Sequence, residues 1–325
     1  MITLGLEEEV FITEPLLPTT RSLYYLSRLL WQNPKRNYKL TASNFARGKD
    51  LKYGLMSGAE VATGICASPE QLISELKVLR EKFASIAEGY IVPMGHLIQV
   101  DTPTNVAALN IHVGCDDKER VYDNIAHFLP VLILLSANSP FKNSQRVGQS
   151  YRLQVGYATG PLLHDRYERF QDLIISKRLG TIELRAFDPI PCLSRIRVLA
   201  QAIFDIASLK GHYPLNLERY MHLRQIAITT GLNDELYGLL CELQKVTNLP
   251  TEMLTYTQSD ATATTFQEKG LLNTYKFMDK LYRGYDFDLP KRSPFMAKFL
   301  QPAAGFLGYY LPKFPYISYK YFKEK

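Results

Sequence analysis

Acidic residues recur at alternate positions in a short segment near the start of the chain. An extended strand there places Glu7 and Glu9 on one face, with Cα atoms about 6.5 to 7 Å apart, and turns Glu8 to the opposite face, where we interpret it as structural. Glu183 and Arg185 repeat the two-residue spacing in a second predicted strand, where apolar residues alternate with them. Both segments therefore predict strands that present charged groups on one face.

Two further predicted strands each carry one group of the same kind, Glu60 and His112. If the four strands share a sheet, four carboxylates and one imidazole converge, and repulsion among the carboxylates favours neutralisation by cations. Carboxylate oxygens with positions left open for phosphate are typical of Mg²⁺, whereas zinc prefers more His or Cys ligands. Arg185 beside such metals suits a carboxylate or a phosphate group.

A plainer interpretation of the same residues stays open. Glutamates on strands usually line a solvated face, and a single residue such as His112 is more typical of a core or surface histidine than of a ligand. Spacing alone does not decide between the two interpretations.

Composition narrows the class of protein. The 325-residue chain is 46% hydrophobic and 22% charged, which is enough apolar material for one large core or two smaller ones. Disorder and a coiled coil are excluded. The 38 Lys and Arg residues are offset by 32 acidic residues, and the net charge of +6 falls short of a nucleic-acid-binding composition. We expect an ordinary globular protein with no nucleic-acid partner.

The cysteines and the apolar segments indicate where in the cell the protein is expected. The four cysteines lie far apart without a CxxC pattern, which favours reduced thiols and disfavours a structural zinc site. The first residues lack the basic start and the longer apolar stretch of an export signal. The longest apolar run, 128–135, is much shorter than the roughly 20 residues of a membrane helix. We expect a cytoplasmic protein with no membrane span.

The elements that must position the charged groups alternate along the chain. Hydrophobic periodicity predicts strands over 4–12, 52–63, 91–100, 106–114 and 181–188, and helices over 22–31, 68–89, 118–135 and much of 192–245. We expect the strands 91–100 and 106–114 to form an antiparallel pair. The polar segment 138–161 is too long for a simple connector, and the segment 286–325 shows no clear periodicity.

Taken together and in order, six short motifs resemble those of the glutamate–cysteine ligase type 2 and carboxylate–amine ligase family, within the glutamine synthetase-like superfamily. The motifs fall at 4–9, 59–66, 111–114, 135–141, 150–152 and 180–185, and so cover roughly the first 190 residues. Each motif alone is weak, but their shared order is specific.

The resemblance implies an α+β fold, in which a curved, mostly antiparallel sheet forms an active-site funnel flanked by helices. Residues 1–285 would form the catalytic domain, and 286–325 an aromatic and basic extension packed on that domain or on a partner subunit. ATP with Mg²⁺ or Mn²⁺ would activate a carboxylate, commonly the side chain of glutamate, as an acyl phosphate. An amine such as that of cysteine would then attack, releasing ADP and phosphate, and the 138–161 loop would act as a lid.

The resemblance also implies roles for individual residues. Glu7, His112 and Glu183 resemble ligands of the metal that grips the transferred phosphate. Glu9 and Glu60 resemble ligands of a second metal. Arg185 and Arg152 resemble the cationic groups that hold substrate carboxylate and phosphate.

The chain departs from the family pattern at two positions. Asn110 stands where a second His is usual, and Thr229 stands at an Arg position of a motif on the nucleotide side, 224–233. Nucleotide affinity and the identity of the amine are therefore open, as is the formation of a homo-oligomer.

Two functions other than a ligase are alternatives for this sequence. A non-catalytic relative that binds nucleotide or metal would have lost a ligand, and none of the five is lost. An interaction protein would use the basic, aromatic C-terminal segment to bind a membrane surface or a partner. Pro312 and Pro315 interrupt a continuous amphipathic helix, which favours an arm that covers the core or a dimer edge instead.

Overall fold

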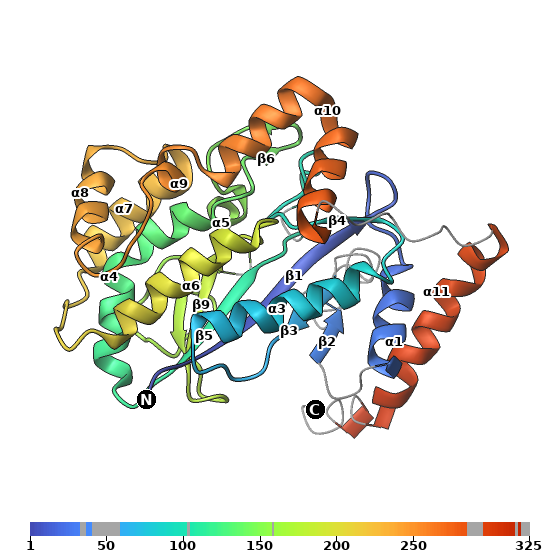
Figure 1. Ribbon diagram of the computed structural model, residues 1–325, viewed down its shortest axis with the longest axis horizontal. Helices are drawn as coiled ribbons and strands as arrows, with labels where there is room; N and C mark the ends of the chain where they lie inside the picture. The colour runs from blue at the N-terminus through green and yellow to red at the C-terminus, as the bar shows by residue number, and fades with distance from the viewer. Residues whose placement is uncertain are drawn as a thin grey trace.

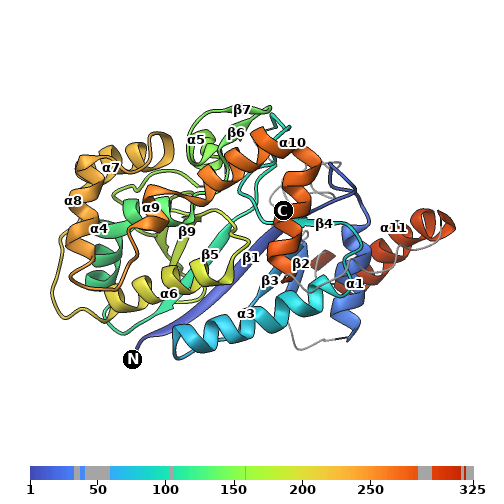
Figure 2. The ribbon, with the colours of Figure 1, turned by 45° about the horizontal axis from the view of Figure 1, so that its top comes forward.

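The longest strand, β1 (Thr3–Thr13), lies at the centre of the fold and pairs with three other strands. The computed structural model describes residues 1–32, 37–40, 59–102, 105–157, 159–284, 295–315 and 318–319. Within these ranges a seven-stranded sheet carries helices on one face, and further helices lie at its two ends (Figures 1 and 2).

The sheet is antiparallel at every pairing. Its order is β2-β3-β1-β5-β9-β8, and β4 pairs with the end of β1. The flanking strands are β2 (Asn37–Leu40), β3 (Ala59–Ala62), β4 (Tyr90–Val92), β5 (Leu109–Gly114), β8 (Leu173–Ile175) and β9 (Ile182–Phe187), and a separate hairpin joins β6 (Phe141–Lys142) to β7 (Gln145–Arg146). This mixed architecture, an open antiparallel sheet with helices, confirms the predicted fold class.

The helices follow the predicted pattern over most of the chain. They are α1 (Ser22–Gln32), α3 (Pro69–Ala84), α4 (Lys118–Ser136), α5 (Tyr151–Val155), α6 (Leu193–Ser208), α7 (Leu217–Thr229), α8 (Asp234–Leu243), α9 (Glu252–Thr255), α10 (Gln258–Arg283) and α11 (Phe295–Tyr310), followed by the short 3₁₀ helix η2 (Leu311–Lys313). Helix α3 starts where Ser68 accepts a hydrogen bond from the Gln71 amide, with Pro69 in the first turn. It ends at Ala84, five residues earlier than predicted.

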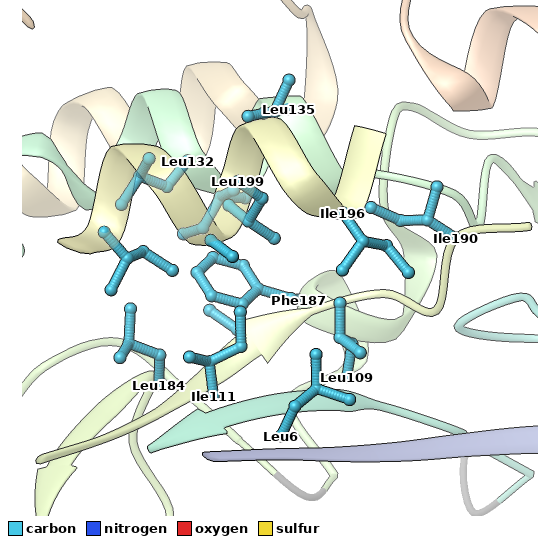
Figure 3. Close-up of a cluster of buried hydrophobic side chains, with 14 of the residues drawn as sticks. Leu6, Leu109, Ile111, Leu132, Leu135, Leu184, Phe187, Ile190, Ile196 and Leu199 are labelled. Atoms are coloured by element: carbon cyan, nitrogen blue, oxygen red, sulfur yellow. The ribbon is translucent and has the colours of Figure 1, made fainter. Parts of the chain in front are cut away.

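The main core lies between the sheet and helices α3, α4 and α6. Figure 3 shows Phe187, Leu184, Ile111 and Leu6 of the strands facing apolar side chains of α4 and α6. Ile196, Leu199, Ile203 and Ile206, the predicted apolar stripe of 192–245, are fully buried there. Because the strand side chains alternate, this core fixes which face of the sheet is left for the charged residues.

Glu8 is the exception on the core face, and a buried arginine neutralises it. Arg80 of α3 donates from Nε to Glu8 Oε2 at 3.0 Å, and also from its terminal nitrogens to Glu8 Oε1 and to the Ile190 and Pro191 carbonyls. The Tyr282 hydroxyl donates to Glu8 Oε2 at 3.0 Å. The side chains of Glu8 and Arg80 are 0% and 2% exposed. This network ties β1 to α3, to the loop after β9 and to α10.

Two expectations about the fold are wrong. The segments 91–100 and 106–114 do not form a strand pair, because β4 and β5 each pair with β1, and His96 and Val106 meet only in an isolated bridge. The segment 138–161 is not an irregular loop, since it contains the β6–β7 hairpin and helix α5. Most of the predicted strand 52–63 lies outside the described residues, and only Ala59–Ala62 is seen as β3.

The C-terminal segment also differs from the expectation, because it contains a regular helix despite Pro302. Helix α11 packs against α1, where Gly305 and Gly308 allow a close approach. None of the described helices is both long enough and apolar enough to cross a bilayer.

The Glu8–Arg80 pair gives the first testable prediction. Arg80→Met should lower the free energy of unfolding by about 3 to 5 kcal/mol, because it leaves a buried carboxylate without its cation. Lys77→Met on the same helix is the matched control, since Lys77 and Glu81 form an exposed pair at 3.9 Å, and it should change stability by less than about 1 kcal/mol. Urea unfolding followed by circular dichroism measures both, and equal effects would contradict the structural role of the pair.

Candidate active site

The face of the sheet opposite the main core carries the predicted site residues. In the antiparallel register, Glu9 pairs with Glu60, and His112 pairs with both Gly5 and Glu183. Paired residues share a face, as do residues two apart on a strand. The face therefore collects Glu7 and Glu9 from β1, Glu60 from β3, His112 from β5, and Glu183 and Arg185 from β9. The structure thus brings together the residues that strand alternation grouped, and their metal-binding role stays a prediction.

Glu7 and His112 form the first group on this face. His112 Nε2 lies 3.9 Å from Glu7 Oε2, and Nδ1 lies 3.3 Å from the Thr181 hydroxyl. Nε2 is buried, and no described residue lies within hydrogen-bond distance of it. A buried ring nitrogen beside a carboxylate is suited to a bound cation, because a cation satisfies both groups.

Glu9 and Glu60 form the second group. Burial, and then the charge of Glu60, raises the pKa of Glu9 to about 8. The Ala108 amide donates to Glu9 Oε2 at 2.8 Å and lowers this pKa, as does the charge of Arg152. Two carboxylates paired across strands thus favour either a proton or a cation between them.

Glu183 and Arg185 form the third group, in which the arginine neutralises the carboxylate. Arg185 Nη1 donates to Glu183 Oε1 at 2.5 Å, and both side chains are largely shielded from solvent. A cation that binds Glu183 would share this carboxylate with Arg185 or displace the guanidinium. A displaced guanidinium would be a candidate to bind an anionic substrate group.

Arg152 lies deeper than a substrate-binding residue is expected to lie. Its side chain is 2% exposed, and its Nε donates to Asp188 Oδ1 at 2.7 Å. Its terminal nitrogens lie 3.3 and 3.4 Å from the Arg185 carbonyl. Arg152 therefore holds the end of β9 in place through Asp188 and the Arg185 carbonyl. Its direct contact with substrate stays a prediction.

Asp188 is a residue that the sequence interpretation missed. It accepts hydrogen bonds from the Ser139 hydroxyl at 2.7 Å and from the Asn138 amide at 2.9 Å, in addition to the Arg152 bond. A Cβ atom at Gly95 would collide with its carboxylate. The only sequence signal was an acidic residue at the end of a strand that a proline follows. The segment predicted as a lid is therefore anchored to β9 at its first two residues and at Arg152.

A cavity of about 580 Å³ opens beside Glu7 and His112. Its walls include three glycines, Gly5, Gly64 and Gly114, whose missing side chains leave room beside β1. The turn before β9 contributes Arg178 and Leu179, and the loop after β3 contributes the exposed Ile65, at 82%. The cavity thus combines apolar walls, a rim cation and the Glu7–His112 group. Sequence reasoning missed Arg178, because a single arginine in a turn gives no signal.

A second cavity of about 490 Å³ is lined in part by residues 230–232 of the predicted nucleotide-side motif 224–233. Arg146 and Asp260 line it and form an ion pair with each other. Arg224 of the motif is buried and bound to Asp172, whose carboxylate also accepts a bond from the Tyr220 hydroxyl at 2.5 Å. Arg224 is therefore structural.

The donor atoms on the charged face fit a hard divalent cation, since carboxylates and one unsatisfied imidazole nitrogen are available. Among the described residues, however, no three His, Cys, Asp or Glu side chains are arranged so that they could hold one ion. Ligation would therefore require rotamer changes, beginning with Glu183, whose carboxylate Arg185 now occupies.

Sequence relatives support the resemblance that the motifs carry. A Rhodococcus jostii protein named "Putative glutamate--cysteine ligase 2-1" is 31% identical over 25% of this chain and 30% of its own length. A Paraburkholderia phytofirmans protein named "Putative glutamate--cysteine ligase 2" is 26% identical over 46% of this chain and 54% of its own length. The matches thus span about half or less of these relatives. No family model matches the chain. The predicted resemblance to glutamate–cysteine ligase type 2 proteins is confirmed.

Solved structures support the fold. The glutamate–cysteine ligase of Francisella tularensis, solved in complex with AMP, superposes with a TM-score of 0.53 at 11% identity, covering 96% of this chain and 94% of that one. A bifunctional glutathione synthetase from Pasteurella multocida gives a TM-score of 0.56 at 14% identity, over 87% of this chain and 51% of that one. At such identities the likeness shows a shared fold.

The raised pKa of Glu9 predicts a pH-dependent stability for the metal-free protein. Between the ordinary pKa of 4.5 and the folded value of about 8, the folded state holds a proton that the unfolded chain has released. This contribution to the free energy of unfolding is present below pH 4.5 and is lost as pH rises to 8. In EDTA, Glu9→Gln should therefore be more stable than the wild type above pH 8, and equal to it near pH 4.5.

Thermal unfolding measured across this pH range tests the expectation. Glu81→Gln, which removes an exposed carboxylate of α3, is the control and should follow the wild type. A Glu9→Gln variant that loses stability in parallel with the wild type from pH 5 to 8 would contradict the repulsion described here.

Proposed function

We propose that this protein is an ATP-dependent carboxylate–amine ligase. It joins a carboxylate to an amine through an acyl-phosphate intermediate and releases ADP and phosphate. The side-chain carboxylate of glutamate is the first candidate for the acid, and cysteine is the first candidate for the amine. The resemblance to glutamate–cysteine ligase type 2 proteins suggests this reaction. The charged face of the sheet is the structural observation that supports it.

The observation that carries the proposal is the grouping of four carboxylates, His112 and Arg185 on one side of a rigid sheet. Phosphoryl transfer requires positioning and charge neutralisation rather than a protein nucleophile. The register of four paired strands supports the positioning of these residues, and the cations that the carboxylates would bind would supply the neutralising charge. One alternative nucleophile, the Cys66 thiol, is poorly suited to attack, since burial and Glu75 raise its pKa to about 11.

Glu7, His112 and Glu183 would hold one divalent cation, and Glu9 and Glu60 a second. When bound, such cations neutralise phosphate oxygens and the charge that develops during transfer. The protein side chains do the remaining work. His112 is held by Thr181 at Nδ1, which leaves Nε2 as the coordinating atom. Glu9 and Glu60 gain a counter-charge that their mutual repulsion requires.

Arg185 has the role of holding an anionic substrate group. Its guanidinium is held against Glu183 in the absence of a cation, and its backbone carbonyl lies against Arg152. Once a cation engages Glu183, the planar guanidinium can bind two oxygens of a carboxylate or phosphate in parallel. Arg152 and Asp188 hold the backbone of Arg185 in position.

The proposed nucleotide site is the 580 Å³ cavity beside Glu7 and His112 rather than the cavity at the motif 224–233, where Arg146 is already paired with Asp260. Its volume suits a nucleotide, Ile65 and Leu179 offer apolar surface for a purine, and Arg178 offers a cation for phosphate. Glu7 and His112, which are proposed to hold the metal of the transferred phosphate, line this cavity. A nucleotide bound beside the first half of β1 would thus bring its terminal phosphate to the charged face.

The experiment that tests the proposal is ADP release with ATP, Mg²⁺, glutamate and a panel of amines, followed by mass spectrometry of the products. Glu7→Gln and Glu183→Gln should each lower amine-dependent ADP release by more than about a hundredfold, because a neutral amide is a weak ligand for Mg²⁺. Both variants should remain folded, because Glu7→Gln relieves carboxylate repulsion and the amide oxygen introduced by Glu183→Gln still accepts a hydrogen bond from Arg185. Glu81→Gln is the control with unchanged turnover.

Full turnover in both variants at limiting Mg²⁺ would contradict the assigned metal ligands. Absence of nucleotide turnover with every acid and amine in the wild type would instead favour a non-catalytic relative.

A further inference from the structure

The net charge of the chain is concentrated at its C-terminal end. Residues 289–325 contain seven Lys and Arg residues and one acidic residue, a net charge of +6 that equals the charge of the whole chain. Residues 1–288 are therefore neutral overall. The same 37 residues hold ten of the chain's Phe and Tyr side chains. A basic, aromatic segment on an otherwise neutral protein calls for an explanation that the ligase site does not supply.

Among the described elements, helix α11 packs mainly against α1. Gly305 and Gly308 face α1, and a Cβ atom at Gly305 would collide with the Tyr24 backbone. On the same side Gln301 is buried, and its Oε1 accepts a hydrogen bond from Arg21 Nε at 2.8 Å. Figures 1 and 2 both show α11 at the edge of the molecule, against α1 and away from the helices that cover the sheet.

Large apolar side chains remain exposed on α11 and on the turn that follows it. Leu300, Leu307, Leu311 and Phe314 are 65, 57, 68 and 65% exposed, and we call them the outer stripe. Leu300 and Leu307 lie seven residues apart on α11, which is the spacing of side chains along one side of a helix, and Leu311 and Phe314 follow in η2 and directly after it. Trp31 of α1, the single tryptophan of the chain, is 68% exposed beside α11, and its Nε1 lies 3.4 Å from the Gly308 carbonyl.

We propose that the outer stripe docks this protein on an anionic lipid surface. An apolar stripe within a segment whose sequence is rich in lysine and aromatic residues has the composition of a helix that lies in the membrane interface. Each basic residue near an anionic leaflet adds to the attraction, and Trp and Tyr rings favour the headgroup region. The binding is peripheral, in keeping with the absence of a spanning helix among the described residues.

Charge argues for lipid rather than for a second copy of this chain as the occupant. A symmetric pair formed through the outer stripe would bring two segments of the same net charge of +6 together. An anionic surface instead neutralises them. The glycine contacts between α11 and α1 hold the stripe in place, so docking needs no rearrangement of the sheet. The inference is independent of the proposed ligase reaction.

The test is co-sedimentation of the full chain with vesicles. We expect binding to vesicles of phosphatidylcholine and phosphatidylserine in a roughly two-to-one ratio, and much weaker binding to phosphatidylcholine alone. Substituting Leu307→Glu and Leu311→Glu together should lower the affinity by about tenfold or more, because charge replaces the apolar contact. Leu163→Glu, at a leucine that is 48% exposed elsewhere on the surface, is the matched control and should bind like the wild type.

Fluorescence of Trp31 provides a second readout that does not depend on pelleting. Its emission should shift to shorter wavelength with the anionic vesicles, and the double variant should lose this shift while its far-ultraviolet circular dichroism is unchanged. Equal binding to both lipid compositions, or equal binding by wild type and double variant, would overturn the proposal. A dimer in sedimentation without lipid that the double variant abolishes would assign the stripe to a second copy instead.

Discussion

Repulsion among the carboxylates on one face of the central sheet is the constraint on which the rest of the structure depends. Strand pairing fixes Glu9 opposite Glu60, and burial together with the charge of Glu60 makes a negative charge on Glu9 costly. The fold tolerates this arrangement because the other face of the same strands is fully packed. The charged face therefore favours a bound proton or a bound cation, and the proposed phosphate transfer would use bound cations.

The elements around the charged face are held together by buried carboxylates that, unlike those of the face, have arginine partners. Arg80 neutralises Glu8 beneath β1, and Arg152 neutralises Asp188 at the end of β9. Arg224 does the same for Asp172 just before β8. Such pairs contribute little net stability, but loss of one partner is costly, so they fix which helix meets which strand. Carboxylates that support the fold are thus paired with arginines, whereas the carboxylates of the candidate site are clustered with one another.

Sequence reasoning predicted the charged face because a strand has a period of two. The alternation of Glu7, Glu8 and Glu9 predicted that two of them share one face and that Glu8 lies on the opposite face, where Arg80 of α3 neutralises it. The partners of strands were harder to predict, since hydrogen bonds between strands leave no local pattern. The 11-residue β1 pairs with both β4 and β5, which separates two strands that looked like a hairpin.

Long-range contacts explain the remaining differences. Asp188 gathers bonds from the distant Asn138, Ser139 and Arg152, which no spacing reveals. Helix α11 carries Pro302 and two glycines, which sequence patterns associate with irregular structure, but the glycines are what allow its contact with α1. The most direct test of the central claim is to place ¹⁸O in the reacting carboxylate of the acid and analyse the released phosphate. Activation as an acyl phosphate predicts ¹⁸O in the phosphate, because that oxygen bridges carbon and phosphorus, whereas amide product with unlabelled phosphate would contradict the account.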